Sequence, residues 1–160
     1  MRAIISLARQ ELILVTEEGD VVGQYLVSTA KAGGGEKSGS GCTPRGLHKV
    51  RARIGEGLPE NSILVGRRPT GEVYTQDMAR QCPGREYILS RILWLSGLEP
   101  GINRMGDVDT MRRYIYIHGT PDCEPMGIPA SHGCIRMRSA DVMLLFDELP
   151  VGSLVEISED

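Results

Sequence analysis

Short apolar runs, each about as long as one β-strand and each closed by glycine, proline or acidic residues, recur along much of this sequence. Residues 11–15 (ELILV) and 21–28 (VVGQYLVS) are rich in aliphatic side chains, and the Glu-Glu-Gly-Asp segment 17–20 between them is typical of a hairpin turn. β-Branched and aliphatic residues in such runs favour the pleated, half-buried surface of a sheet. This pattern predicts a mostly β domain.

Further segments have strand character. Residues 47–54 (LHKVRARI) alternate apolar and basic side chains, which indicates a half-buried strand. Periodicity alone does not assign residues 87–95 (YILSRILWL) to a strand or a helix, and we interpret them as a strand. In residues 113–119, tyrosines alternate with isoleucines before the glycine that interrupts the run. The remaining strand candidates are residues 62–66, 71–75 and 153–157.

One segment shows helical spacing. We expect Ser139 to be the N-cap of a helix over residues 140–149 (ADVMLLFDEL), and Pro150 to end that helix. Apolar side chains recur at helical intervals at Val142, Leu145, Phe146 and Leu149. The predicted fold class is therefore mostly β with one or two helices.

Length and composition indicate a single globular domain that spans residues 1–160. The chain has 160 residues, of which 41% are hydrophobic and 24% charged, and it shows no internal repeat or linker. The formal net charge is −3, and Lys and Arg are not clustered in long runs, so we expect no nucleic-acid partner.

The N-terminal segment bears on location. In residues 1–15 the apolar stretch is interrupted by Ser6, Arg9, Gln10 and Glu11, whereas a signal peptide has about 7–15 apolar residues in a row. Nothing approaches the ~20 apolar residues of a membrane-spanning helix, so no membrane association is expected. We predict a cytoplasmic protein, or a periplasmic one if a native leader is missing.

Cysteine and histidine spacing does not suggest a metal site or a disulfide framework. The sequence has no Cys-x-x-Cys pair, its histidines are dispersed, and a cytoplasmic location argues against disulfides. Cys42, Cys82 and Cys123 are assigned no function, and His48 is expected to be structural or on the surface. No phosphate-binding or zinc-peptidase motif is present, and no cofactor or metal is expected.

A chemically active cluster is predicted in the stretch HGTPDCEPMGIPASHGCIRM, which begins at His118. A thiol has an ordinary pKa of about 8.5, and an imidazole within hydrogen-bond reach can remove its proton to create a nucleophile. His118 and His132 are the candidate bases, and Cys134 is the candidate nucleophile. Gly133 permits a tight turn, in which the N–H groups of Gly133 and Cys134 form an oxyanion hole.

This segment resembles the L,D-transpeptidase (YkuD-type) family. The family pattern is a His at the end of a strand, a loop, and then Ser/Thr-His-Gly-Cys. The Thr-Pro-Arg-Gly turn at 43–46, the opening pair of strands and the final helix and strand match it in the same order. The resemblance covers nearly the whole chain and implies a single-domain, β-sandwich-like catalytic fold.

The resemblance also implies roles for individual residues. Cys134 corresponds to the nucleophile and His118 to the general base, with the carbonyl of Gly119 orienting its imidazole. His132 and Ser131 match the motif positions before the nucleophile.

Arg136 stands where many members of the family have Asn. A guanidinium is suited to bind a substrate carboxylate, but it could equally form an internal salt bridge near the site. The two interpretations of Arg136 remain open.

The implied substrates are murein stem peptides or muropeptides. Cys134 would form a thioester at the third-position L-centre and release D-alanine. With water as acceptor the enzyme is an L,D-carboxypeptidase of peptidoglycan recycling, which the expected cytoplasmic location favours. With an amine as acceptor it is an L,D-transpeptidase that forms 3→3 cross-links.

Two other classes of function are alternatives. A catalytically inactive module that binds peptidoglycan fragments is disfavoured by the intact set of motif residues. A cysteine hydrolase of the NlpC/P60 kind is disfavoured because its Cys precedes its His along the chain. The glycine-rich residues 33–41 lack the Lys-Ser/Thr of a phosphate-binding loop, and we expect them to form a lid or flexible rim near the cleft.

Overall fold

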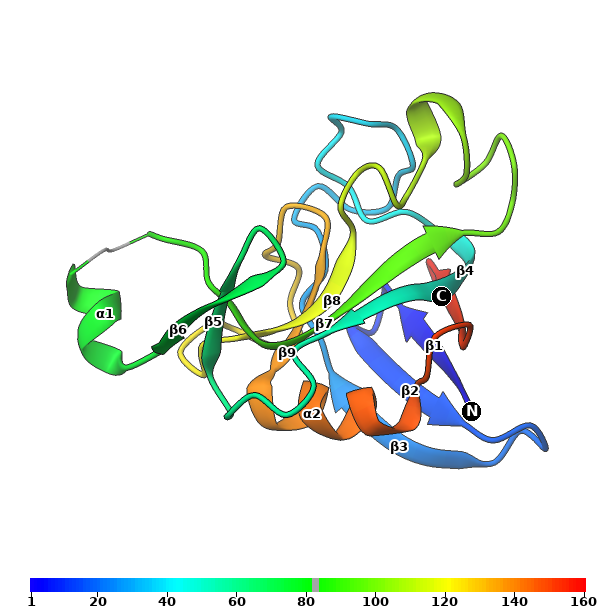
Figure 1. The fold of residues 1–160 in the computed structure, drawn as a ribbon. Helices are drawn as coiled ribbons and strands as arrows, with labels where there is room; N and C mark the ends of the chain where they lie inside the picture. Colours follow the sequence, from blue (N-terminus) through cyan, green and yellow to red (C-terminus); the bar gives the residue numbers. More distant parts are fainter. Residues whose placement is uncertain (82–83) are drawn as a thin grey trace.

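One curled β-sheet forms the frame of the molecule (Figure 1). The structure is a computed structural model that describes residues 1–81 and 84–160. Within those residues the elements are β1 (Arg2–Ser6), β2 (Glu11–Val15), β3 (Val21–Leu26), β4 (Gly46–Ile54), β5 (Ser62–Val65), β6 (Arg68–Val73), α1 (Gln76–Gln81), β7 (Ile88–Gly97), a short 3-10 turn (Gly106–Val108), β8 (Tyr116–Thr120), β9 (Ile135–Arg138), α2 (Ser139–Glu148) and β10 (Leu154–Ser158).

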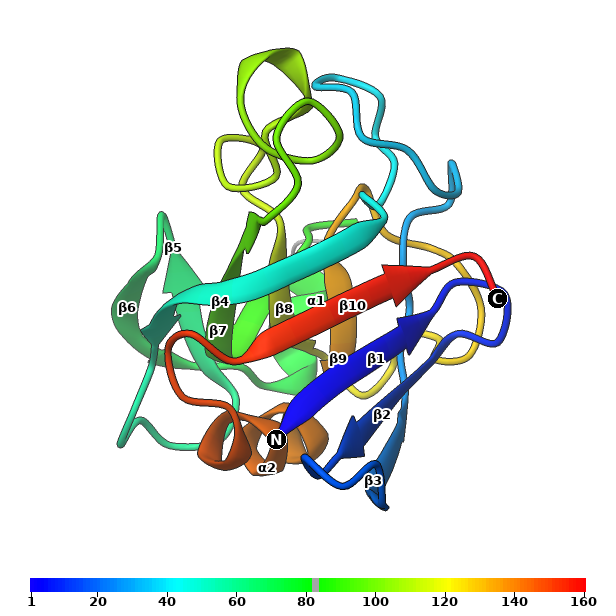
Figure 2. The ribbon, with the colours of Figure 1, turned by 90° about the vertical axis from the view of Figure 1, so that its right-hand side faces the viewer.

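The sheet runs in the order β3-β2-β1-β10-β4-β7, and β7 then pairs with β8, which pairs with β9. Figure 2 shows the first five of these strands side by side, with α2 beneath them. The sheet curls far enough for Ser28, just past β3, to pair with Arg136 in β9. The N–H of each residue donates to the carbonyl of the other at 2.9 Å. This pairing joins the two ends of the sheet.

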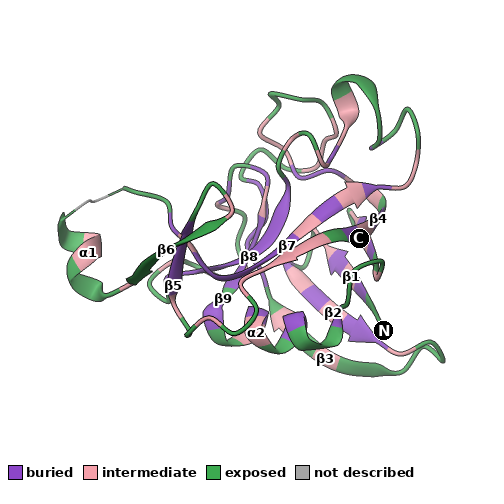
Figure 3. Cartoon of the chain, viewed as in Figure 1, coloured by how far each residue is buried: buried purple, intermediate pink, exposed green. Residues whose placement is uncertain are grey.

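The main core lies inside the curl and is completed by α2, which packs against β7, β8 and β9. Buried side chains are concentrated along β7 and β8 (Figure 3). The helix contributes its predicted apolar stripe, since Val142, Leu145, Phe146 and Leu149 are all buried. Burial of each such large side chain contributes roughly 1.5–3 kcal/mol, so α2 holds the inner strands in place.

The central strand β7 is irregular next to the end of β8. Ser90 has a φ of 71°, and the register between β7 and β8 shifts between Leu89 and Ile92. Gly119 pairs with Leu89, and a Cβ at position 119 would lie 2.5 Å from the Leu89 carbonyl oxygen. Only glycine allows this close approach of the two backbones. The irregularity thereby sets how β8 lies against β7 around His118, which pairs with Ile92.

The β5–β6 hairpin and α1 project from the sheet (Figure 1). All residues of β6 are exposed, and α1 buries none of its residues. A small cluster of Ile63, Tyr87 and Leu89, with Tyr74 and Met78 packed against it, ties this projection to the start of β7.

The predicted fold class is confirmed, and so are most of the predicted elements. Residues 11–15 form β2, which pairs antiparallel with β3 as expected for a hairpin. Residues 47–54 fall within β4, and the ambiguous run at 87–95 lies largely in a strand, β7. The final strand predicted at 153–157 is β10. No helix in residues 1–81 or 84–160 has the length and apolarity needed to span a membrane.

Three predictions of local structure were wrong in detail. Ser139 is the first residue of α2 and not its N-cap, and its hydroxyl has no hydrogen-bond partner among the described residues. The strand expected at 113–119 begins only at Tyr116, because Tyr114 adopts a φ of 57°. The strand expected at 71–75 is β6, which ends at Val73. Strand β9 and helix α1 were not predicted as separate elements.

Candidate active site

His118 is the middle residue of β8 and is buried, so the strand continues past the position where the sequence suggested that it ends. Its Nδ1 is 2.7 Å from the carbonyl oxygen of Gly119, so the Nδ1–H donates to that oxygen and Nε2 is left to accept a proton. Burial lowers the pKa of His118, and the Gly119 hydrogen bond offsets only part of this effect. The imidazole is therefore neutral at pH 7, with a fixed tautomer. The contact expected from Gly119 is present.

Cys134 is half-buried and lies immediately before β9. Its Sγ is 3.4 Å from the Tyr114 carbonyl oxygen, to which the thiol donates, and 3.4 Å from the Tyr116 nitrogen, whose N–H points at the sulfur. Burial raises the pKa of the Cys134 thiol to about 11. The resting group is thus a thiol that needs a base to become a nucleophile.

Cys134 and His118 line the same cavity, whose volume is about 200 Å³. Among the described residues, neither group hydrogen-bonds directly to the other. Catalytic hydrogen bonds are often long in the absence of substrate. The lack of a direct bond between His118 and Cys134 is therefore compatible with a base that acts only when a substrate fills the cavity. The other residues around this cavity are Glu86, Ile88, Arg113, Tyr114, Ile115, Tyr116 and His132.

A tight turn before Cys134 is held by Ser131. The Ser131 hydroxyl donates to the carbonyl of Cys134 at 2.6 Å and accepts the N–H of Gly133 at 3.2 Å. Gly133 has a φ of 133°, which favours glycine. The Gly133 N–H is therefore occupied in this state, whereas the Cys134 N–H donates to none of the described residues. Of the two N–H groups predicted for an oxyanion hole, only that of Cys134 is free.

Glu86 is a member of this site that sequence reasoning missed. Its carboxylate accepts hydrogen bonds from Arg136 at 2.8 Å and 3.3 Å, and lies 3.3 Å from Nδ1 of His132. Burial raises the pKa of Glu86, but the hydrogen bonds and charge of Arg136 outweigh it and hold that pKa below its usual range. No local pattern points to Glu86, because its partners lie in a distant part of the chain.

The contacts of Arg136 bear on its two possible roles. Its side chain is only 7% exposed and is bound to Glu86, with Glu124 at 3.8 Å as a second carboxylate. Of the two interpretations of Arg136 that the sequence allowed, the structure contains the internal salt bridge. A substrate carboxylate would have to displace Glu86 or bind alongside it.

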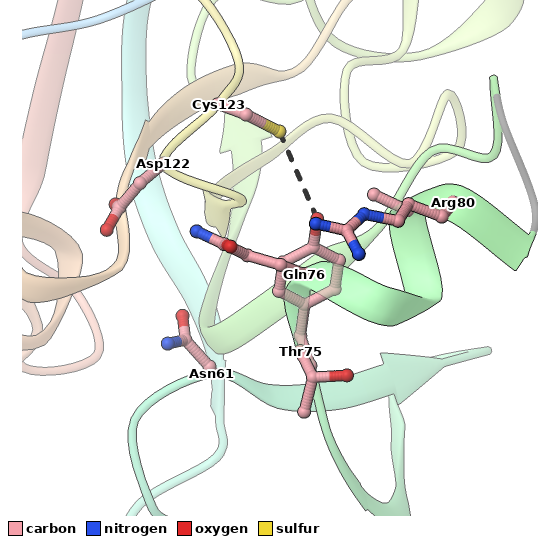
Figure 4. A pocket seen from close by; sticks show the side chains of 8 residues that line it. Asn61, Thr75, Gln76, Arg80, Asp122 and Cys123 are labelled. Atoms are coloured by element: carbon pink, nitrogen blue, oxygen red, sulfur yellow. Dashed lines mark hydrogen bonds between the residues drawn. The ribbon is translucent and has the colours of Figure 1, made fainter.

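Further cavities adjoin the cavity of Cys134 on both sides. One of about 350 Å³ shares Glu86 and His132 with it, and continues past Tyr74 and Cys123 into another of about 400 Å³ (Figure 4). The Cys123 sulfur lies 3.9 Å from the Tyr74 hydroxyl oxygen, and this contact is the dashed line that starts at Cys123 in Figure 4. On the opposite side, a cavity of about 470 Å³ shares His132 and lies beside the glycine-rich segment. An extended ligand could therefore cross the site.

Of the remaining predicted residues that the structure describes, His48, Cys42 and Cys123 do not line this cavity. His48 is buried and structural, with Nδ1 3.0 Å from the Gly46 carbonyl and Nε2 2.9 Å from the Thr110 hydroxyl. Cys42 and Cys123 are free thiols, and Cys82 lies outside the described residues. Within residues 1–81 and 84–160, no group of three or more His, Cys, Asp or Glu side chains is placed to hold a metal ion.

Comparison with protein-family models gives one match over nearly the whole chain. Residues 1–157 match the YkuD model, which is described as the L,D-transpeptidase catalytic domain. Among curated proteins, the probable L,D-transpeptidase YbiS of Escherichia coli K12 is 40% identical over 48 residues, which are 30% of this chain and 16% of that protein. The putative L,D-transpeptidase YqjB of Bacillus subtilis is 48% identical over 44 residues, 28% of this chain and 25% of that protein.

Solved structures show the same fold. L,D-transpeptidase 3 of Mycobacterium tuberculosis, in complex with a faropenem-derived adduct, aligns with a TM-score of 0.59 at 14% identity, over 98% of this chain and 59% of that one. The L,D-transpeptidase of Xylanimonas cellulosilytica aligns with a TM-score of 0.55 at 22% identity, over 98% of this chain and 59% of that one. The chain therefore corresponds to little more than half of these proteins.

Proposed function

Because this chain belongs to the L,D-transpeptidase catalytic domain family, we propose that it is a cysteine acyl-transfer enzyme that acts on stem peptides of peptidoglycan. Cys134 is the nucleophile and His118 the base in this proposal. One observation carries the assignment: the bond from Nδ1 of His118 to the Gly119 carbonyl leaves a neutral Nε2 in the cavity that also holds the Cys134 thiol.

The proposed reaction begins with transfer of the Cys134 proton to Nε2 of His118. The thiolate attacks the carbonyl carbon between the L-centre and the terminal D-alanine, and the negative charge moves to the oxygen. The free N–H of Cys134 donates to that oxygen. As the carbon–nitrogen bond breaks, His118 returns the proton to the departing amine. D-Alanine leaves, and the acyl group remains on Cys134 as a thioester.

The second half of the reaction depends on the acceptor. We propose water as the favoured acceptor, which makes the enzyme an L,D-carboxypeptidase of peptidoglycan recycling in the cytoplasm. His118 takes a proton from the water as it attacks, and Cys134 leaves as a thiol. The cavities on both sides of Cys134 favour a second candidate, in which the amine of another stem peptide attacks and a 3→3 cross-link forms.

Mass spectrometry of the products tests these assignments. The purified protein is incubated with a tetrapeptide, free or disaccharide-linked, that ends in D-alanine, with and without an added D-amino acid. Loss of D-alanine to water, absent in Cys134→Ala, is the expected result. Exchange of the terminal residue or dimer formation would instead identify a transpeptidase. If Cys134→Ala retains turnover, or if the wild-type protein only binds the peptide, the proposal is wrong.

Arg136 has a separate test within the same assay. If Arg136 binds a substrate carboxylate, Arg136→Ala raises KM, whereas Glu86→Gln, which keeps the guanidinium, does not. If the Arg136–Glu86 pair is only structural, both variants lose stability and neither changes KM. Cell fractionation with an antibody to the protein tests the proposed cytoplasmic location.

A further inference from the structure

The glycine loop (residues 33–43) lies against the turn that carries Cys134. The buried Thr43 hydroxyl donates to the carbonyl oxygen of Gly133 at 2.8 Å. A Cβ at position 133 would lie 3.3 Å from the Cys42 carbonyl oxygen, so the two backbones are in contact at this point. The conformation of the turn at Gly133 and Cys134 therefore depends on where the glycine loop sits.

Arg113 holds the other side of the glycine loop. Its Nη1 donates to the carbonyl oxygens of Gly35 and Glu36 at 3.2 Å and 3.1 Å. Its Nη2 donates to the carbonyl of Cys42 at 2.6 Å and lies 3.4 Å from the Ser40 hydroxyl. Within the described residues, this guanidinium forms no ion pair, so its donors are used on the loop.

These contacts add to others that order the loop, namely the ion pair of Glu36 with Arg45 and the backbone bonds across its neck. Glycine loses more conformational freedom on folding than other residues, and hydrogen bonds to a charged group are stronger than those between neutral groups. The same guanidinium lines the cavity of Cys134, where its positive charge favours the thiolate. Arg113 thus contacts both the loop and the cavity of the nucleophile.

We propose that Arg113 is a positioning residue of the active site. Its hydrogen bonds hold the glycine loop in one position. The loop in turn holds the Gly133–Cys134 turn through the hydrogen bond from Thr43 to Gly133. This role rests on the proposed function only in that Cys134 is taken as the nucleophile. It replaces the expectation of a lid: the loop is a fixed wall of the site.

The experiment measures alkylation of Cys134 by iodoacetamide from pH 6 to 10, with the modified residue identified by mass spectrometry. The variants are Arg113→Met, Arg113→Lys, Thr43→Val and the double variant Arg113→Met/Thr43→Val. Thr43→Ser keeps the hydroxyl, and Arg104→Met removes an exposed charge from another loop, so these two serve as controls. Circular dichroism checks that each variant is folded, and peptide turnover is measured in parallel.

Arg113→Met is expected to slow alkylation at neutral pH by roughly 3- to 10-fold and to move the profile to higher pH. Arg113→Lys keeps the charge but not the set of bonds to the loop, so part of the defect remains. Thr43→Val shows a defect in the same direction, while Thr43→Ser and Arg104→Met behave like wild type. Because Arg113 and Thr43 act along one path, the double variant is no slower than the worse single variant.

Three outcomes overturn the proposal. The first is a wild-type alkylation profile for Arg113→Met. The second is a wild-type profile for Arg113→Lys, which would show that the positive charge alone is sufficient. The third is a double variant whose fold reduction in alkylation rate equals the product of those of the single variants. If Arg113→Met does not fold, Arg113→Lys and Thr43→Val decide. Alkylation needs no substrate, so the positioning role can hold even if no peptide is turned over. Turnover by Cys134→Ala would refute the proposed function instead.

Discussion

Burial favours the neutral form of both Cys134, the proposed nucleophile, and His118, the proposed base. It raises the pKa of the Cys134 thiol to about 11 and lowers the pKa of His118. The resting pair is therefore a thiol and a neutral imidazole, not a preformed ion pair. In the proposed mechanism, proton transfer from Cys134 to His118 therefore occurs in the step in which a substrate excludes water and presents its carbonyl.

A first prediction at the residue scale concerns this pKa. Alkylation of Cys134 in the free protein should be slow at pH 7. Its rate should go on rising with pH well above about 8.5, the ordinary pKa of a thiol. The rate constant is measured against pH by mass spectrometry, and the exposed thiol of Cys123 serves as the internal reference. Rapid and selective labelling of Cys134 at neutral pH would show that the resting site already holds a thiolate.

A second residue-scale prediction concerns Glu86. Glu86→Gln removes the charge that Arg136 faces, and should lower the free energy of unfolding by roughly 1–2 kcal/mol, since Glu86 is partly exposed and its charge is screened. Glu124, at 3.8 Å from Arg136, is the matched control, and Glu124→Gln should cost less than about 0.5 kcal/mol. Urea denaturation measures both, and equal losses would count against a special role for Glu86.

At the scale of elements, the position of His118 depends on how β7 and β8 meet. Leu89 and Gly119 approach so closely that no side chain fits at position 119. The β7 irregularity at Ser90 and the glycine after His118 are thus two parts of one arrangement. The sequence shows the glycine, but the contact that requires it forms only when β7 and β8 pair.

This arrangement predicts the effect of a single methyl group. Gly119→Ala should destabilise the fold by about 1–3 kcal/mol, because the backbone of β7 must move. Gly23→Ala in β3 is the control, since its new Cβ would meet only side-chain atoms, those of Tyr25 and Leu14, at 3.2–3.4 Å. Its cost should stay within about 1 kcal/mol. Thermal and urea unfolding of both variants provide the comparison, and a wild-type stability for Gly119→Ala would contradict this reading of the strand contact.

At the scale of the whole molecule, stability should fall on the acid side of neutrality. Burial lowers the pKa of His48 to about 4, and the pKa of His118 is lowered for the same reason. The unfolded chain binds protons at these histidines below about pH 6.5, where the folded chain does not. Stability is therefore lost as the pH falls from about 6.5 toward 4, by up to ~3 kcal/mol for His48.

Urea denaturation at pH 7, 6 and 5 measures this loss. His48→Gln should flatten the pH dependence between pH 6.5 and 4, because it removes the buried titrating group. A slope that is the same in His48→Gln and wild type would assign the acid sensitivity to other groups.

Local signals in the sequence determined the hairpin of β2 and β3, the buried stripe of α2 and the residues of the His-Gly and Ser-His-Gly-Cys segments. Each of these depends on neighbours along the chain: a turn, a period or a short motif. Ser139 shows the limit even at this range, because its position relative to the start of α2 follows from how the helix leaves β9.

Only the tertiary structure decided the partners of those residues. The pairing of Ser28 with Arg136, the bond of Arg136 to Glu86 and the clamp of Arg113 on the glycine loop all join segments far apart in the chain. No spacing rule connects such residues, because their contact is set by the curl of the sheet and by the packing of α2 inside it. Burial, which sets the pKa values of Cys134 and His118, is likewise a property of the assembled fold. The sequence alone thus indicated the candidate reacting groups, while the fold determined their protonation and their surroundings.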